Sequence, residues 1–282
     1  MSHTGAESRM RLIVNADDFG FTPSVNAGIV EAHLRGIVTS ASMFVNLPGW
    51  EDGIAHAASL RSVGNRLSIG LHLNLLIGSP VTHCPSLTNH RTGVFHSFRT
   101  LIARALLHRV DANEIEAECT AQLQRLADVG IRATHVDSHR HTHGFPGFYA
   151  PVARAAERAG IRFVRVPLEP FSTGRRSLPV FLKKLYMHNV LRRAAGGRPP
   201  VPSVGMSLTG DPQFGRDIVR LVGALSPGTW ELMVHPGYTS PELVQLDGYA
   251  AAREDELAAL VDPATADQIR ECGVELISFA DV

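Results

Sequence analysis

The segment from Thr134 to Pro146 is dense in imidazole side chains, with histidines at His135, His139, His141 and His143. Imidazole at this density is typical of metal binding or proton transfer. The alternation of a strand places His135, Asp137 and His139 on one side for as long as the strand lasts. These histidines cannot all coordinate one ion, so most of them must contact other groups.

A second concentration of reactive groups lies near the amino terminus, where the apolar run Leu12–Ala16 ends in Asp17 and Asp18. Adjacent strand residues point to opposite faces, so the two carboxylates are not equivalent. A turn at Phe19–Gly20 could bring both into one cavity, because glycine accepts backbone conformations that other residues avoid. Alternatively, Asp18 could cap a helix that begins near Pro23.

A metal ion that activates water needs two or three nitrogen and oxygen ligands and a nearby base that does not coordinate it. The chain offers four side chains for such a set, Asp17, Asp18, His72 and His139. His72 lies in Ser68–Asn74, where alternation puts Asn74 on the same face. A histidine in this position could instead be a hydrogen-bonded residue of the interior.

Two further polar residues interrupt apolar runs. His235 follows Leu232–Val234 and precedes a Pro-Gly turn. It could serve as a general acid or make a structural hydrogen bond. Arg165 lies inside the run Phe163–Pro167, where an unpaired buried charge would be costly. We expect it to orient a carboxylate such as Asp17 or to join an interior salt bridge.

These residues must be positioned by a regular framework. Apolar runs rich in β-branched residues alternate with helical patterns, and strands are predicted at 12–18, 38–46, 67–75, 134–139, 163–167, 230–235 and 275–279. Helices are predicted at 23–35 and 50–60. The pattern predicts an α/β barrel of about seven parallel strands, with a doubly wound open sheet as the alternative. Either fold gathers the candidate residues at the carboxyl ends of the strands.

One domain is expected over residues 11–282, after a disordered tail over 1–10. Two segments break the alternation: 76–110, which contains an apolar helix, and 170–212. The second segment carries a series of cations without an acid between them, Arg175, Arg176, Lys183, Lys184, Arg192, Arg193 and Arg198. Apolar residues at helical spacing predict a basic amphipathic helix there. This insertion could be a lid, a packing element or a membrane contact.

Composition narrows the classes of partner. Lys and Arg together number 27, as do Asp and Glu, so nucleic acid is not expected as the main partner. Cys84, Cys119 and Cys272 are widely spaced and form no Cys-x-x-Cys pair, so we expect no disulfide framework or thiolate zinc site. The first ten residues lack the apolar segment of a signal peptide, and no membrane span is evident. A cytoplasmic location is therefore expected.

Several motifs together resemble one family. The chain contains, in order, NADDFG, VNAGIVEAHLRGIVTSASMFVN, GLHLNL, THVDSHRHTHGFP and MVHPG. Their order and spacing are similar to those of the YdjC-like carbohydrate deacetylases, which include chitooligosaccharide deacetylases and HpnK proteins. The resemblance runs from about Leu12 to the carboxyl terminus. It implies a distorted (β/α) barrel that removes the N-acetyl group from an amino sugar, on an oligosaccharide or a glycolipid.

The resemblance also implies roles for individual residues. It makes Asp18, His72 and His139 ligands of one divalent metal ion and Asp17 the base that accepts a proton from water. His235 is then the candidate proton donor to the leaving amine. The ligand set suits zinc by its softness, whereas the resemblance points to magnesium, so both ions stay open.

Some assignments stay open. His143 could compete with His139 as a ligand, because a four-residue spacing occurs in related polysaccharide deacetylases. We place Arg165, His143 and Asn74 among residues that contact substrate or support the ligands. The alternatives to a deacetylase are a metal-dependent phosphoester hydrolase acting on a sugar phosphate and a non-catalytic carbohydrate-binding module. Peripheral membrane contact and a homodimer are further possibilities.

Overall fold

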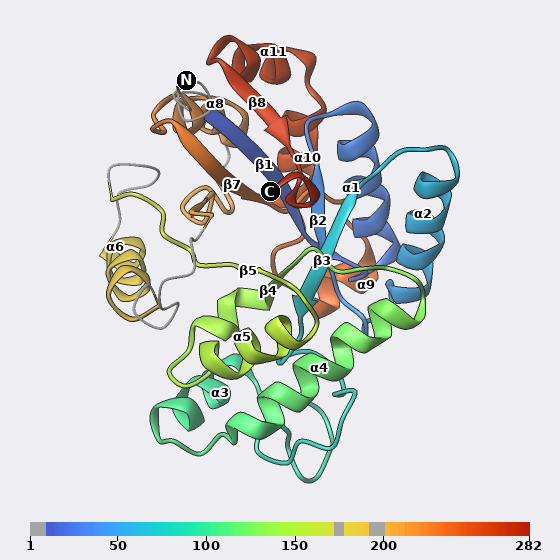
Figure 1. The fold of residues 1–282 in the computed structure, drawn as a ribbon, viewed down its shortest axis with the longest axis vertical. Helices are drawn as coiled ribbons and strands as arrows, with labels where there is room; N and C mark the ends of the chain where they lie inside the picture. The colour runs from blue at the N-terminus through green and yellow to red at the C-terminus, as the bar shows by residue number, and fades with distance from the viewer. Residues whose placement is uncertain (1–9, 172–177, 192–200, 212) are drawn as a thin grey trace, which may run out of the picture.

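The computed structural model describes residues 10–171, 178–191, 201–211 and 213–282 (Figure 1). Its centre is a parallel sheet in the order β5-β4-β3-β2-β1-β7-β6, with β8 paired to β1. The strands are β1 Met10–Phe19, β2 Ser40–Met43, β3 Ser68–Leu73, β4 His135–Ser138, β5 Phe163–Val164, β6 Ser203–Val204, β7 Gly228–Val234 and β8 Val274–Ile277. A parallel bridge between Val166 and Pro202 joins the two edges. The predicted distorted barrel is therefore confirmed.

β1 is the axis of this sheet. It pairs with β7 along Met10–Ala16 on one side. On the other side, its first half pairs with β8 and its second half with β2. Every residue of β1 from Leu12 onward is buried. Such burial on both faces explains why the strand reads as a continuous apolar run in the sequence.

Helices surround the strands (Figure 1). The α-helices are α1 Pro23–Arg35, α2 Trp50–Ser62, α3 Phe98–Leu106, α4 Ala112–Asp128, α5 Tyr149–Arg158, α6 Leu178–Tyr186, α8 Phe214–Gly223, α9 Pro241–Leu246, α10 Ala252–Val261 and α11 Pro263–Glu271. Short 3-10 or π turns are η1 His139–Gly144, η2 Met187–Leu191 and η3 Phe279–Asp281. The helix predicted at 23–35 matches α1. Its cap is Thr22, whose side chain accepts a hydrogen bond from the Val25 amide, so Asp18 does not cap it.

The two segments that break the alternation supply helices beside the barrel. The first contains α3, and the second contains α6, which lies apart from the strands (Figure 1). Lys184 of α6 does not belong to a solvated cationic face, because its side chain is 3% exposed and its Nζ lies 2.9 Å from Glu169 Oε1. Of the remaining predicted cations, Arg175, Arg176, Arg192, Arg193, Arg198 and the side chain of Lys183 lie outside the described residues.

Two expectations concern the ends of the chain and membranes. The predicted tail over 1–10 lies outside the described residues except for Met10, which is the first residue of β1. Among the described helices, none combines the length and the apolar character needed to cross a membrane.

Candidate active site

Asp17 and Asp18 both line one cavity, although they are adjacent on β1. Asp18 has a φ of 72°, in the left-handed region that side chains other than glycine seldom occupy. At the same place, the register between β1 and β2 shifts between Ala16 and Phe19. The expected turn at Phe19–Gly20 is therefore only part of the explanation, because the backbone already departs from extended geometry at Asp18. This departure lets consecutive carboxylates share a cavity.

Asp18 lies between two imidazoles from other elements. Its Oδ1 is 3.1 Å from Nε2 of His72 on β3 and 3.2 Å from Nδ1 of His139 at the start of η1. The potential ligand atoms of these three buried residues lie within 4.8 Å of one another. Among the described residues, buried His72 Nε2 has no hydrogen-bond partner other than Asp18. One carboxylate and two imidazoles at these separations fit a divalent metal ion.

His72 is held from its other side. Its Nδ1 is 2.7 Å from Asp137 Oδ1 and 3.1 Å from Ser42 Oγ. Burial acts to lower the pKa of His72, but the charges and hydrogen bonds of Asp137 and Asp18 outweigh burial and raise the pKa to about 10. Carboxylates that hold a proton on this ring so strongly also favour a cation bound to it. A carboxylate behind a ligand histidine is a common means of fixing ring orientation.

Arg253, from α10, is a member of the site that the sequence analysis did not identify. Its side chain is buried, and its Nη2 lies 2.5 Å from Asp18 Oδ2 and 3.2 Å from Asp247 Oδ2. Burial acts to raise the pKa of Asp18, but the charge of Arg253 and hydrogen bonds from His139 and His72 hold it well below its ordinary value. Asp18 is therefore ionised, with one oxygen held by Arg253 and the other directed at the histidines.

Asp17 has different partners. Arg165 donates to both of its oxygens, with Nη1 2.6 Å from Oδ2 and Nη2 2.7 Å from Oδ1. The Asn15 amide adds a third donor at 2.9 Å from Oδ1. This bidentate pairing fixes the plane of the carboxylate. Asp17, His72 and Asp137 also form a possible ligand group, but Arg165 Nη2 already contacts both acids, at 2.7 Å each.

Arg165 itself is fully enclosed. Besides Asp17 and Asp137, it contacts Glu231 on β7, with Nε 2.9 Å and Nη2 2.6 Å from Oε1. The expected roles of Arg165, orienting Asp17 and joining an interior salt bridge, thus describe one arrangement. Burial raises the pKa of Glu231 to about 7, against the lowering charge of Arg165. Arg165 does not line the cavity and supports Asp17 from behind.

His235 lies at the cavity wall just after β7. Its Nε2 is 4.0 Å from Asp17 Oδ2, and its Nδ1 is 3.9 Å from Glu256 Oε1. Its backbone amide donates to Glu256 Oε2 at 2.6 Å. Tyr249 contacts the same histidine ring at an edge and donates its hydroxyl proton to Glu256. The side chain of His235 is 15% exposed, so it can reach a bound molecule while Glu256 holds it from behind.

The other predicted residues are placed away from the cavity. Asn74 stabilises a turn by accepting from the amides of Leu76 and Ile77, both at 3.0 Å. His143 contacts Ser138 Oγ through Nδ1 and the Arg165 carbonyl through Nε2. The structure thus brings His139, rather than His143, to Asp18. β4 ends at Ser138, and η1 then carries the chain out of the alternation on which the sequence argument relied.

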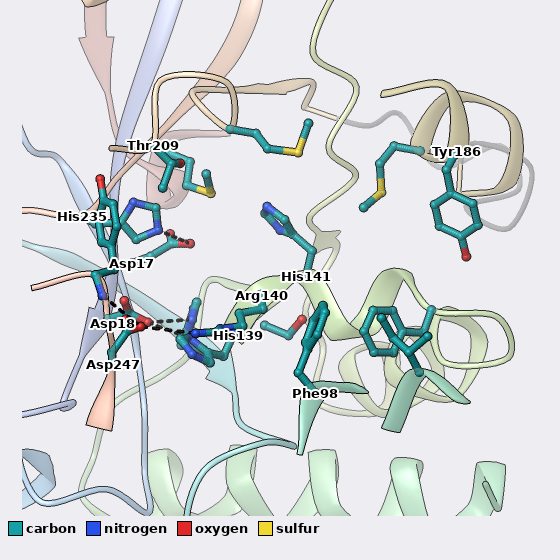
Figure 2. A pocket seen from close by; sticks show the side chains of 18 of the residues that line it. Asp17, Asp18, Phe98, His139, Arg140, His141, Tyr186, Thr209, His235 and Asp247 are labelled. Atoms are coloured by element: carbon teal, nitrogen blue, oxygen red, sulfur yellow. Dashed lines mark hydrogen bonds and ion pairs between the residues drawn. The ribbon is translucent and has the colours of Figure 1, made fainter. Parts of the chain in front are cut away.

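The cavity has a volume of about 650 Å³ and two chemically different ends (Figure 2). We call one the acid end, formed by Asp17, Asp18, His72, His139 and His235. The other, the apolar end, is formed by α3, the residue after η1 and the junction of α6 with η2: Phe98, Ile102, Leu106, Phe145, Tyr186 and Met187. In Figure 2, Phe98 and Tyr186 lie across the cavity from Asp17 and Asp18.

Several supporting residues were missed, and their sequence signals differ. Asp137 was placed on one face with His135 by strand alternation but was given no role, although a carboxylate beside a candidate ligand histidine is a recognisable signal. Glu231 is an acid within an apolar strand, which signals a buried ion pair. Arg253 and Glu256 lie on a helix far along the chain from β1 and β7, and no local pattern connects them to the site.

Comparisons with known proteins match nearly the whole chain. A family model described as "YdjC-like protein" matches residues 11–271. A carbohydrate deacetylase of Geobacillus stearothermophilus is 34% identical over 274 residues, which cover 95% of this chain and 96% of the relative. A chitooligosaccharide deacetylase of Proteus mirabilis is 32% identical, over 96% of this chain and 98% of the relative.

A solved structure gives the same result for the fold. A crystal structure from Enterococcus faecalis V583, named provisionally as a cellobiose-phosphate cleavage protein, matches with a TM-score of 0.77 and 25% identity. The match covers 97% of this chain and 99% of that one. With the family model, these matches confirm the resemblance seen in the motifs, and the chain belongs to the YdjC-like family.

Proposed function

We propose that the protein is a metal-dependent hydrolase that removes the N-acetyl group from an N-acetylated amino sugar and releases acetate. One observation carries the proposal: adjacent carboxylates enter one cavity with different partners. Asp18 Oδ1 faces two imidazoles, whereas both oxygens of Asp17 are held by Arg165. The names of the relatives, which are carbohydrate and chitooligosaccharide deacetylases, support the reaction and the substrate class.

Asp17 is the proposed base. A divalent ion held by Asp18, His72 and His139 would polarise the acetamide carbonyl and make a nearby water more acidic. Asp17 accepts the proton that this water loses as its oxygen attacks the carbonyl carbon. Arg165 and Asn15 hold the carboxylate in one orientation, so little reorganisation is needed when the proton moves.

His235 is the proposed acid. The amide nitrogen must gain a proton before its bond to the acyl carbon breaks, since an amine is a far better leaving group than an amide anion. His235 faces Asp17 across 4.0 Å and thus lies close to the proposed base. Glu256 contacts both its backbone amide and its ring, which fixes the ring at the cavity wall. Acetate and a free amine on the sugar are the products.

The identity of the ion belongs to this proposal. Two imidazole nitrogens and one carboxylate oxygen suit zinc, cobalt or nickel, while magnesium prefers oxygen ligands. The resemblance noted in the motifs points to magnesium, so magnesium and zinc are the two ions to test first.

The test is acetate release from N-acetylated saccharides after chelation and separate reconstitution with Mg²⁺, Zn²⁺ and Co²⁺. The proposal expects activity that is lost on chelation and restored by at least one ion. Hydrolysis of sugar phosphates without acetate release would favour the phosphoester alternative instead. Sugar binding of full affinity without turnover under any ion would favour the non-catalytic module.

Three finer predictions accompany the proposal: a cytoplasmic location, a homodimer and contact of the basic segment with a membrane surface. The last rests on the sequence between 175 and 198, which has cations but no acid. Because Lys184 is buried against Glu169, the cations to neutralise are Lys183, Arg192 and Arg193. Co-sedimentation with anionic vesicles should fall in that triple variant. Unchanged sedimentation, or none for the parent protein, would refute the membrane contact.

A further inference from the structure

The two ends of the cavity place different demands on a substrate. At the acid end, charged groups can bind the acetamide and the polar groups near it. At the apolar end, Phe98, Ile102 and Leu106 lie four residues apart along α3 and therefore share one face of that helix. Phe145 extends this surface, with its ring centroid 5.6 Å from that of Phe98.

Tyr186 contributes a ring rather than a hydroxyl to the apolar end. Its hydroxyl donates a hydrogen bond to the Gly144 carbonyl at 2.8 Å, so this donor is already satisfied within the cavity wall. Met187 follows it with a thioether. The guanidinium of Arg140 lies over the Phe98 ring, 5.8 Å from its centroid, and is paired with Asp247. Hydroxyls of a second sugar ring that faced Phe98, Ile102 or Leu106 would lose water without gaining a hydrogen-bond partner from these side chains, which is unfavourable. A hydrocarbon group would find a surface that favours it.

The apolar end is also accessible. Leu106 is 62% exposed although it lines the cavity, and Phe98 and Ile102 are only half-buried. Large apolar side chains of the protein core are normally enclosed, as Leu101 of the same helix is, at 0% exposure. The apolar end is therefore a surface that a bound group can cover, not part of the core.

We propose that the substrate is an N-acetylated amino sugar with an apolar aglycone, an alkyl or aryl group that lies against α3 and Tyr186 while the acetamide occupies the acid end. This inference rests on the proposed deacetylase function and names its substrate class. It commits to a hydrocarbon aglycone in place of a second saccharide unit. The physical reason is that each buried methylene improves binding by roughly fourfold, whereas an unpaired hydroxyl weakens it.

The experiment compares acetate release from three substrates with the same N-acetylglucosamine unit: the β-methyl glycoside, the β-hexyl glycoside below its micelle concentration, and the β-linked disaccharide of N-acetylglucosamine. The expected kcat/KM for the hexyl glycoside exceeds that for the methyl glycoside by about tenfold or more, as burial of two or more methylenes gives. It also exceeds the value for the disaccharide. Equal values for the two glycosides, or a preference for the disaccharide, would overturn the inference.

A binding measurement separates this inference from the proposed function. Calorimetric titration of the holoenzyme with the hexyl and methyl glycosides should show tighter binding of the hexyl glycoside, with a more negative heat-capacity change. If neither glycoside releases acetate but the hexyl glycoside binds more tightly, the substrate class stands and the deacetylase proposal fails. Equal affinities reject the substrate class whether or not acetate is released.

Two neighbouring leucines give a matched pair of variants. Leu106 lines the cavity and Leu107 does not, yet their exposed fractions are 62% and 61%. Leu106→Asn should reduce the hexyl-to-methyl ratio of kcat/KM by roughly fourfold, while Leu107→Asn should leave it unchanged. A ratio that falls equally in both variants would show a general effect on α3 and would contradict the assignment.

Discussion

The acid end and the apolar end of the cavity are built from different parts of the chain. The acid end is carried by barrel strands and the residues that directly follow them, and Asp17, Asp18 and His72 are each at most 2% exposed. The apolar end is carried by α3 and the end of α6, both in segments that interrupt the strand–helix alternation. The barrel therefore carries the groups proposed for the reaction, and the two insertions carry most of the surface proposed for the aglycone.

If the acid end alone carries the reaction, Asp17→Asn should cause the largest loss of activity among the variants considered. The amide cannot accept water's proton, so kcat should fall by about 10²–10⁴-fold. Metal content should be unchanged, because the ion is proposed to lie between Asp18, His72 and His139, whereas Arg165 occupies both oxygens of Asp17. The hexyl glycoside should still bind at the apolar end. Asp267→Asn, at a side chain 66% exposed, is the control and should keep full activity. An active Asp17→Asn variant would remove the proposed base.

Glu231 tests how far the acid end depends on burial. Its pKa is raised by burial from 4.5 to about 7, so the folded state favours its protonated form. The resulting contribution to the free energy of unfolding is full below about pH 4.5 and is lost as pH rises to about 7. In Glu231→Gln this titration is absent, so the stability difference between parent and variant should change by about 3 kcal/mol across that window. Urea unfolding at several pH values measures it, and a constant difference would contradict the shifted pKa.

His235 separates proton donation from positioning. His235→Asn should reduce kcat by about 10²-fold with little change in KM, because the ring is proposed to act during bond cleavage. Glu256→Gln retains an acceptor for the His235 amide and should reduce kcat less. A similar loss of kcat from both substitutions, with KM raised in each, would assign His235 a purely structural role.

The smallest expected effect is a change in KM when the contacts that attach α6 to the rest of the protein are removed. Lys184 of α6 lies 2.9 Å from Glu169 and donates to the Pro170 carbonyl at 2.8 Å, which anchors the helix that carries Tyr186. Lys184→Met should therefore raise KM for the hexyl glycoside severalfold and leave that for the methyl glycoside nearly unchanged. Equal changes for both substrates would mean that the insertion supports the whole cavity and not the apolar end alone.

The sequence predicted the elements that follow from local chemistry. α1 was found because Pro23 and apolar residues at helical spacing both mark it, and β1 because burial on both faces makes it a continuous apolar run. β6 was missed, since two residues, Ser203 and Val204, carry too little pattern to detect. The segment 170–212 was recognised as an insertion, but the burial of Lys184 depends on Glu169, which no helical periodicity could reveal.

The site was predicted as a set of residues rather than as an arrangement. Asp17, Asp18, His72, His139 and His235 do line one cavity, because parallel strands deliver their carboxyl ends to one side. The different partners of the two aspartates were harder to foresee. They depend on the left-handed backbone of Asp18 and on contacts with Arg165 and Arg253. Those contacts join segments that only the complete fold brings together.

The bridge between Val166 and Pro202 is the part of the barrel that should open most easily. Among the described residues, this single pair completes the circle, whereas every adjacent pair of strands shares at least two register partners. Local separation should require the least work at this seam. Amides there should exchange with deuterium sooner than those of β1. Arg165 directly precedes Val166, so opening of this edge would also displace the guanidinium that holds Asp17.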